Sequence, residues 1–264
     1  MQFFDSHCHF DFSEFDGDRD NIWRDCQARG VRQLMIPGVS LSSFTAAAAI
    51  AGQYEGIYTA AGLHPWWVEK DLGAADVVLN PSSIHDRLLA RLVNPKCVAV
   101  GECGLDAVIN TSLPLQQQVL DIHLQVASET GLPLIIHCRK AHNELVVQLK
   151  TRKLSAGGVI HAFSGSYELA TAYWEMGFRL GIGGTITYER ANKTRQAVKK
   201  LPLEALLLET DAPDMPLYGR QGEPNSPVNI PAIAQVLADL REEPVAIIAA
   251  HTTRNARQLF KISD

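Results

Sequence analysis

Two histidines two residues apart, His7 and His9, follow a short apolar run near the start of the chain. Alternate residues of a β-strand point to the same face, so a strand here would aim both imidazoles at one point. Imidazole is the commonest metal ligand in proteins, and two of them make half of a metal site. The same spacing also occurs in pairs of surface histidines, so the interpretation depends on finding the remaining ligands.

Further side chains able to bind metal come directly after other apolar runs. In a TIM barrel, residues at the carboxyl ends of the strands line one mouth, where the active site lies. Clustered histidines and carboxylates are costly to bury, whereas divalent cations neutralise the acids and use the imidazole lone pairs. The number of such residues predicts two metal ions. The candidates are His7, His9, His64, Glu102, His137, His161 and Asp211.

The other histidines fall in predicted helices or at their caps, where surface or groove positions are expected. They are His85, His123, His142 and His251.

Eight short aliphatic segments alternate with helical patterns along the whole chain. Strands followed one by one by helices predict parallel βα units with the sheet buried on both sides. At this length we expect one closed (β/α)₈ TIM barrel, an α/β fold, with residues 1–264 forming a single domain. After the opening strand, the predicted strands are Gln33–Ile36, Ile57–Ala61, Cys97–Val100, Leu134–Ile136, Gly158–Ile160, Phe178–Gly181 and Ala205–Leu208.

The composition is that of a globular protein able to bury a large core: 264 residues, 46% hydrophobic and 20% charged. The five cysteines form no Cys-x-x-Cys pair, which argues against a disulfide framework or a zinc ribbon. There is no secretory signal and no apolar run of membrane-spanning length. We therefore expect a cytoplasmic protein that does not enter a membrane, and the sequence suggests no obligate protein partner.

The formal net charge of −5 gives no broad basic surface for holding duplex DNA along its length. Any contact with nucleic acid should be local. A basic run, Arg190 to Lys200, is more typical of a solvated helix face.

Two further features have competing interpretations. Cys8, Cys103 and Cys138 each adjoin a candidate ligand, but strand alternation turns them outward, so we predict small buried side chains. Trp66 and Trp67 suit either stacking on a base or packing within a loop.

Seven segments, in this order, resemble the TatD family of metal-dependent hydrolases, within the amidohydrolase-like barrels. The resemblance covers essentially the whole chain. The segments are Asp5-Ser6-His7-Cys8-His9, Gly62-Leu63-His64-Pro65, Gly101-Glu102-Cys103-Gly104-Leu105-Asp106, Pro133-Leu134-Ile135-Ile136-His137-Cys138-Arg139, His161-Ala162-Phe163-Ser164-Gly165, Glu209-Thr210-Asp211-Ala212-Pro213 and Thr253-Arg254-Asn255-Ala256.

The resemblance implies a barrel of the metallo-dependent hydrolase type and assigns the metal ligands. His7, His9 and Asp211 would hold one divalent ion, His137 and His161 the second, and Glu102 both. The ions would be Zn²⁺, Mn²⁺ or Mg²⁺.

The resemblance also implies hydrolysis of a phosphodiester at a single-stranded DNA or RNA end, or in a small molecule. A hydroxide shared by the two ions would attack phosphorus. Asp211, Glu102 and His64 would be catalytic, and His64 and Arg139 would also hold the phosphate.

The chain departs from the family pattern in two places. The aromatic residue that usually follows the Gly-Leu-Asp segment is replaced by Ala107. The usual Asn-Glu-Pro is Asn225-Ser226-Pro227, which keeps Asn225 as a candidate substrate ligand without the acid.

Two other functions fit the same residues. One is hydrolysis of an amide, ester or lactone, because the same metal-activated water attacks carbonyl carbon. The other is a non-catalytic, metal-stabilised binding protein. Structural zinc sites are usually closed and rich in cysteine, which disfavours this second alternative.

Overall fold

The computed structural model describes residues 1–72 and 80–263. Eight strands form one sheet in which neighbours follow the chain order from β1 to β8. The pairs β1–β2, β3–β4, β4–β5 and β7–β8 are parallel. The predicted α/β fold of the (β/α)₈ class is thereby confirmed. No helix among the described residues is long and apolar enough to cross a membrane.

The chain folds as two compact units. Unit 1 comprises Met1–Ile36, Glu55–Ile57 and Ile160–Asp264, and unit 2 comprises Pro37–Tyr54 and Tyr58–Val159.

Unit 1 contains the first two strands and the last elements of the chain. Its elements are β1 (Phe3–Asp5), α1 (Arg19–Ala28), β2 (Val31–Ile36), α7 (Tyr167–Glu175), β7 (Phe178–Ile182), α8 (Asn192–Lys200), β8 (Leu206–Leu208), α9 (Ile230–Arg241) and α10 (Val245–Phe260).

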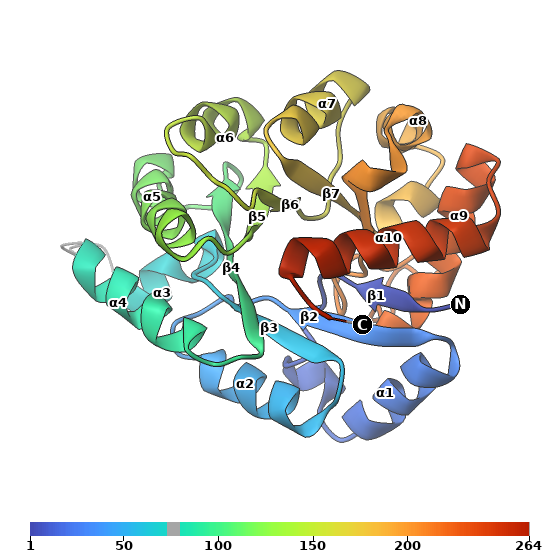
Figure 1. Ribbon diagram of the computed structural model, residues 1–264, viewed down its shortest axis with the longest axis horizontal. Coiled ribbons are helices and arrows are strands. Elements are labelled where there is room, and N and C mark those ends of the chain that lie inside the picture. Colours follow the sequence, from blue (N-terminus) through green and yellow to red (C-terminus); the bar gives the residue numbers. More distant parts are fainter. Residues whose placement is uncertain (73–79, 264) are drawn as a thin grey trace. The chain divides into compact units, whose positions relative to one another are not determined.

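Helix α10 lies against β1 and β8 and fixes both ends of the chain to the sheet (Figure 1). Phe4 and Phe260 stack with ring centroids 5.8 Å apart in the core. The Thr253 hydroxyl donates to the Gln2 carbonyl (3.0 Å), and the Asn255 amide donates to the Leu206 carbonyl (3.0 Å). The closing motif found in the sequence thus stabilises the strands that lead into the candidate site.

Unit 2 carries the longest strand and the longest helix of the described chain. Its elements are α2 (Phe44–Gln53), β3 (Ile57–Ala61), α3 (Val68–Leu72), α4 (Pro81–Leu92), β4 (Cys97–Asp106), α5 (Leu113–Thr130), β5 (Leu134–Arg139), α6 (His142–Leu149) and β6 (Gly158–Ile160), with β3 and β6 at the unit boundary.

Helix α5 shows how local sequence sets these elements. Pro114 stands in its first turn, and Gly131 ends it with φ +65°. Proline is tolerated in a first turn, and glycine adopts this left-handed conformation without a Cβ clash. The helix packs on β4 and lies beside α4 (Figure 1).

Strand β4 runs six residues beyond its predicted end at Val100 and reaches Asp106. Gly101, directly after the predicted strand end, and Gly104 instead let β4 and β5 approach closely. At Gly104, with φ +148°, a Cβ would lie 1.9 Å from the His137 carbonyl oxygen. Glu102 and Asp106 therefore lie within a strand, and not in the loop after it.

Candidate metal centre

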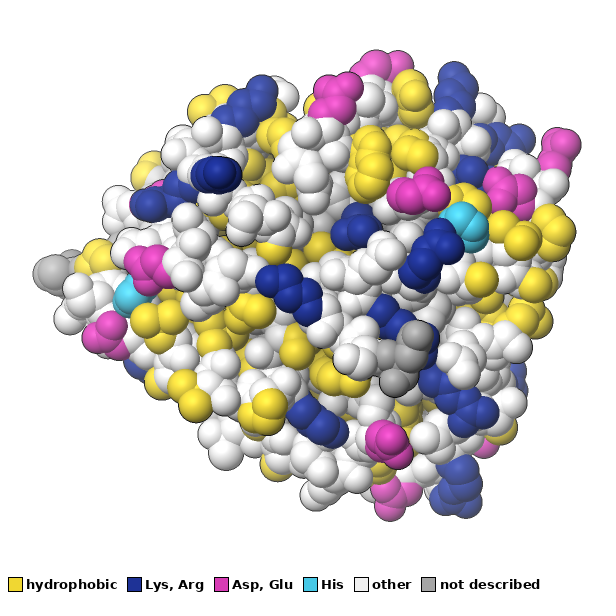
Figure 2. All heavy atoms as spheres, viewed as in Figure 1, with side chains coloured by type: hydrophobic (Ala, Val, Ile, Leu, Met, Phe, Trp, Pro, Cys, Tyr) yellow, Lys and Arg dark blue, Asp and Glu magenta, His cyan; other side chains and the backbone are white. Residues whose placement is uncertain are grey.

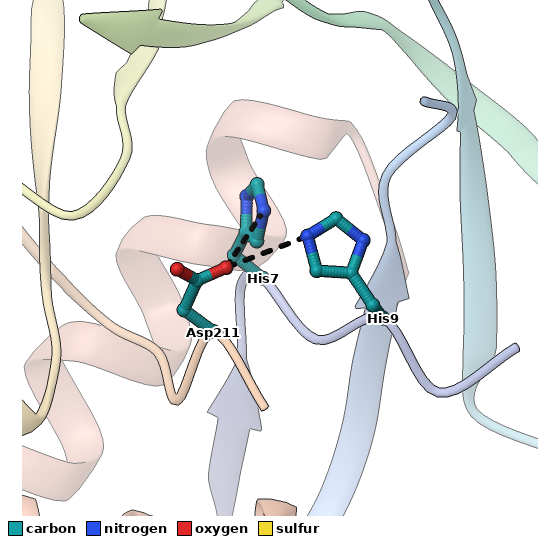
Figure 3. A group of neighbouring side chains, drawn as sticks. All are labelled: His7, His9 and Asp211. Atoms are coloured by element: carbon teal, nitrogen blue, oxygen red, sulfur yellow. Dashed lines mark ion pairs between the residues drawn. The ribbon is translucent and has the colours of Figure 1, made fainter. Parts of the chain in front are cut away.

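In unit 1, His7, His9 and Asp211 point their polar atoms toward one another (Figure 3). Asp211 Oδ1 lies 3.4 Å from His7 Nε2 and 3.5 Å from His9 Nε2. One ligand atom from each residue falls within 4.8 Å of the others, so these three residues could hold a metal ion. The structure thus brings together the three predicted ligands of the first ion.

Backbone hydrogen bonds between two distant segments set this arrangement. Asp211 N–H donates to the His7 carbonyl (2.8 Å), and His9 N–H donates to the Ala212 carbonyl (2.8 Å). Between the histidines, Cys8 is fully buried, and its thiol donates to the Ala212 carbonyl. Only β1 up to Asp5 is regular strand, yet the alternation predicted for His7, Cys8 and His9 continues through an isolated bridge between Cys8 and Ala212.

The other two cysteines beside candidate ligands differ in exposure. Cys103 is fully buried, as predicted, whereas Cys138 is half-buried.

The Asp211 carboxylate is ionised over the whole physiological range. Burial alone would raise its pKa, but the hydrogen bond from His9 and the nearby His161 and His7 lower the pKa to about 2. Asp211 also has φ +56°, an uncommon conformation for a residue with a side chain. An ionised carboxylate between imidazoles is a suitable ligand set for a divalent cation.

His161, the fourth histidine of the predicted site, stacks on His7 in the same unit. Their ring centroids are 3.9 Å apart and the rings are nearly parallel. Glu209, which was not among the predicted site residues, lies beside His161, with Oε1 3.9 Å from His161 Nδ1. Burial raises the pKa of Glu209 to about 8, and its carboxyl accepts the Ala162 N–H. Glu209 therefore fixes the backbone that follows His161.

Unit 2 contains a second cluster, formed by His64, Glu102 and His137. Glu102 Oε1 lies 3.3 Å from His64 Nε2 and 3.3 Å from His137 Nδ1. Ligand atoms of these residues again lie within 4.8 Å of one another. The structure thus places His64, predicted as a phosphate ligand, among residues that could also hold a metal.

The hydrogen bonds of this cluster indicate where the imidazole protons lie. His64 Nδ1 accepts the Trp66 N–H (3.1 Å), so its proton belongs on Nε2, facing Glu102. His137 Nε2 lies 3.1 Å from Asp106 Oδ2, so a proton there leaves a lone pair on Nδ1, also facing Glu102. Two lone-pair atoms this close repel unless a proton or cation lies between them. The donor set of His137 and Glu102 therefore fits a cation.

Asp106 is the main residue of this cluster that was not predicted from the sequence. It also accepts the Trp66 indole N–H (2.7 Å) and the Val108 N–H (2.9 Å). Burial would raise its pKa, but the hydrogen bonds from His137 and Trp66 hold the pKa well below its ordinary value. A carboxylate that orients a ligand histidine is a common feature of metal sites.

Gln116 on α5 holds Asp106 in place. Its side chain accepts from Asp106 N–H (2.7 Å) and donates to the carbonyls of Asp106 (2.9 Å) and Thr111 (2.7 Å). Gln116 is buried, and in the sequence it gave no sign of this role.

His123 lies in a helix, as predicted, but inside the core and not at the surface or groove position that was expected. It is fully buried in α5, donates from Nδ1 to the Val119 carbonyl (2.8 Å) and accepts the Leu63 N–H at Nε2 (3.0 Å). Because Leu63 precedes His64, this contact positions the strand end that carries His64. Burial lowers the pKa of His123 to about 4.

The two remaining predicted substrate ligands have different surroundings. Arg139 is exposed at the end of β5, two residues after His137. Asn225 is buried, donates to the carbonyls of Thr210 (2.9 Å) and Met215 (3.1 Å), and accepts from Ser226 N–H (2.8 Å) and the Asn229 amide (2.9 Å). Through these contacts Asn225 stabilises its loop. Its contact with substrate stays a prediction.

A cavity of about 620 Å³ lies elsewhere in unit 1, along α10. Arg254, Arg257 and Lys261 contribute to its wall, and Figure 2 shows Lys and Arg side chains over this helix. Among the described residues that line it, none is a histidine or an acid. This cavity therefore lacks the donors for the predicted metal chemistry.

The chain is similar to known proteins over almost its whole length. The chain is 42% identical to the Escherichia coli K12 protein named uncharacterized metal-dependent hydrolase YjjV, over 99% of this chain and 98% of that protein. The crystal structure of YjjV, a TatD homologue, superposes with a TM-score of 0.91, at 40% identity over 99% of this chain and 98% of that one.

A further relative is the Escherichia fergusonii protein named 3'-5' ssDNA/RNA exonuclease TatD. It is 33% identical over 98% of this chain and 99% of its own length. The family described as TatD related DNase matches residues 4–261. The chain therefore belongs to the TatD-related DNase family and is a metal-dependent hydrolase.

Proposed function

We propose that this enzyme hydrolyses phosphodiester bonds and shortens single-stranded DNA or RNA from an end. The observation that carries the proposal is the His7, His9 and Asp211 cluster, an ionised carboxylate between two imidazoles. Membership of a DNase family and 33% identity to a protein named as a single-strand exonuclease support the choice of a phosphodiester.

We retain the ligand assignment that the resemblance implies. In this assignment His7, His9 and Asp211 would hold one ion, His137 and His161 would hold the other, and Glu102 would be a ligand of both. The clusters support His7, His9 and Asp211 in unit 1 and Glu102 and His137 in unit 2, and His161 stacks on His7. Zn²⁺ and Mn²⁺ match the mixed imidazole and carboxylate donors, and Mg²⁺ can substitute in excess.

Two divalent ions, when bound, would lower the pKa of a water to about 7 and stabilise negative charge on the phosphate oxygens. Asp211 would orient the attacking water and accept its proton, since the carboxylate is ionised at neutral pH. His64 and Arg139 would hold the phosphate, Arg139 through its planar set of donors.

A strand end suits this protein better than a long duplex. The formal net charge of −5 offers little general attraction for a polyanion, so binding depends on local contacts at the metal ligands. An unpaired end also lets the terminal phosphodiester reach buried ligands such as His7 and His9.

A substrate panel tests the proposal. Single-stranded oligonucleotides, a dipeptide and a lactone are each incubated with protein and Mg²⁺, Mn²⁺ or Zn²⁺. We expect metal-dependent shortening of the strands, abolished by Asp211→Asn and unchanged by Asp25→Asn, the same change on exposed helix α1. Cleavage of the dipeptide or lactone without shortening of any strand contradicts the proposal.

A further inference from the structure

Trp66 is an exposed aromatic side chain held against the unit 2 cluster. It lies in the short 3-10 helix η2 (Pro65–Trp67), which follows β3, and 55% of its surface is accessible. Single exposed aromatics are common, so exposure alone implies no function. The contacts of Trp66 distinguish it from an ordinary surface residue.

The indole N–H of Trp66 is tied to the carboxylate that also contacts a candidate metal ligand. It donates to Asp106 Oδ2 (2.7 Å), and the same oxygen lies 3.1 Å from His137 Nε2. Gln116 fixes the backbone of Asp106 on both its N–H and its carbonyl. The edge of the indole is thus anchored, and its polar group is used within the protein.

Contacts with His64 also restrict the orientation of Trp66. The Trp66 backbone N–H donates to His64 Nδ1 (3.1 Å), and the two rings meet edge to face with centroids 5.6 Å apart. Both partners of the indole therefore belong to the candidate site. A ring whose orientation is set in advance loses little entropy when it binds a flat ligand.

The neighbouring indole provides an internal comparison. Trp67 is less exposed, and the Lys70 ammonium lies 4.2 Å from the centre of its ring. Its surface is thus engaged by a cation from α3. Trp66 and Trp67 share a residue type and a turn but differ in what they offer to a ligand.

We propose that Trp66 binds the terminal nucleotide by stacking on its base, next to the phosphate bound at His64. The inference rests on the proposed function, because it takes the substrate to be a nucleic-acid strand. Stacking on an aromatic side chain tolerates any base, so a strand of mixed sequence is accepted. Asp106 contacts both the Trp66 indole and His137, so it is the positioning residue that fixes the indole relative to His137.

Two labelled strands that differ only at their terminal nucleotides provide the test. One carries normal bases at both ends, and the other has abasic nucleotides there. Equilibrium binding is measured by fluorescence anisotropy with Mn²⁺ in an Asp211→Asn background, so that the strands stay intact. We expect the strand with terminal bases to bind about 5- to 150-fold more tightly, the range of one base stacked on an aromatic ring.

The preference should disappear in Trp66→Ala and in Trp66→Leu, which keeps apolar bulk in the loop if the alanine variant does not fold. The Trp66→Phe variant should retain most of the preference for the strand with terminal bases. The matched control, Trp67→Ala, should retain the whole preference. The inference is overturned if the two strands bind equally before any change at Trp66, or if the preference survives both Trp66→Ala and Trp66→Leu.

Cleavage by the unsubstituted protein separates this inference from the proposed function. If neither strand is shortened but the preference depends on Trp66, the inference stands and the nuclease proposal fails. If strands are shortened without any preference for a terminal base, the nuclease proposal stands and the role of Trp66 is rejected.

Discussion

Asp5 and Thr210 are joined by two hydrogen bonds, from Thr210 N–H to Asp5 Oδ1 (3.0 Å) and from the Thr210 hydroxyl to Asp5 Oδ2 (2.6 Å). Asp5 Oδ1 also accepts the His7 N–H (3.2 Å). The pair thus connects the segment of His7 to that of Asp211. Burial raises the pKa of Asp5 to about 7, and the hydrogen bonds from Thr210 and His7 oppose that shift.

Removing the Asp5 carboxyl should weaken both the fold and the metal site. Asp5→Ala leaves three buried donors without their acceptor, which we expect to lower the free energy of unfolding by about 1–3 kcal/mol and to weaken Mn²⁺ binding. Asp5→Asn keeps one oxygen for the two N–H donors, so it should lose less stability and less Mn²⁺ affinity than Asp5→Ala. Urea denaturation and calorimetric titration measure the two effects. Equal stability of Asp5→Ala and the unsubstituted protein would show that this link is unimportant.

Asp106 should affect metal binding through His137 without being a ligand. Asp106→Ala removes the acceptor at His137 Nε2, and losses of this kind typically weaken a metal site by about 10- to 100-fold. Asp121→Ala is the matched control, since Asp121 lies on the exposed side of α5 and pairs with Arg152. Titration with Mn²⁺ or Zn²⁺ reports the affinity. Unchanged affinity in Asp106→Ala would mean that His137 needs no orienting partner.

The close approach of β7 to Glu209 predicts a strong effect of a single methyl group. A Cβ at Gly181 would lie 1.9 Å from Glu209 Oε2, so Gly181→Ala must displace the buried carboxyl. We expect a loss of about 1–3 kcal/mol in the free energy of unfolding. Gly52→Ala, in exposed α2 with no atom within 4 Å of the added Cβ, should be neutral or stabilise by up to about 1 kcal/mol. Similar values for the two variants in urea denaturation would contradict this packing.

His123 should make stability fall as the pH is lowered. Its pKa is 6.5 in an unfolded chain and about 4 in the folded protein, so between these values the unfolded state binds more protons. Stability from this group is complete above pH 6.5 and decreases by about 2 kcal/mol between pH 7.5 and pH 5. His123→Gln can still accept the Leu63 N–H but does not titrate.

Urea denaturation at both pH values, compared between His123→Gln and the unsubstituted protein, isolates this effect. The comparison is necessary because Asp5 and Glu209, with raised pKa values, contribute in the opposite direction. An equal pH dependence in the two proteins would mean that protonation of His123 does not lower the stability of the fold.

The sequence predicted the residues that offer metal ligands better than those that hold them in place. His7, His9 and Asp211 follow strand ends, where the topology alone predicts that side chains meet. Asp106 was missed because Gly101 was interpreted as the end of a strand, whereas the structure uses Gly101 and Gly104 for close strand packing. Gln116 lies in a helix, and nothing in its local pattern indicates that its side chain reaches Asp106.

Asn225 illustrates a different limit of sequence interpretation. Its match to the family pattern suggested contact with substrate, but that pattern does not show which hydrogen bonds the side chain already makes. In the structure both ends of the amide are used within its own loop. Whether a side chain is used within the fold or is available to a ligand depends on distances in the folded protein. The spacing of residues in the sequence does not give those distances.

The product ladder from a single-stranded oligonucleotide labelled at one end tests metal-dependent exonuclease activity most directly. With Mn²⁺ we predict products that shorten one nucleotide at a time, no products after chelation, and none from Asp211→Asn. Asp25→Asn should give the unsubstituted ladder. An intact strand under every metal condition, or an unchanged ladder from Asp211→Asn, would contradict the central claim.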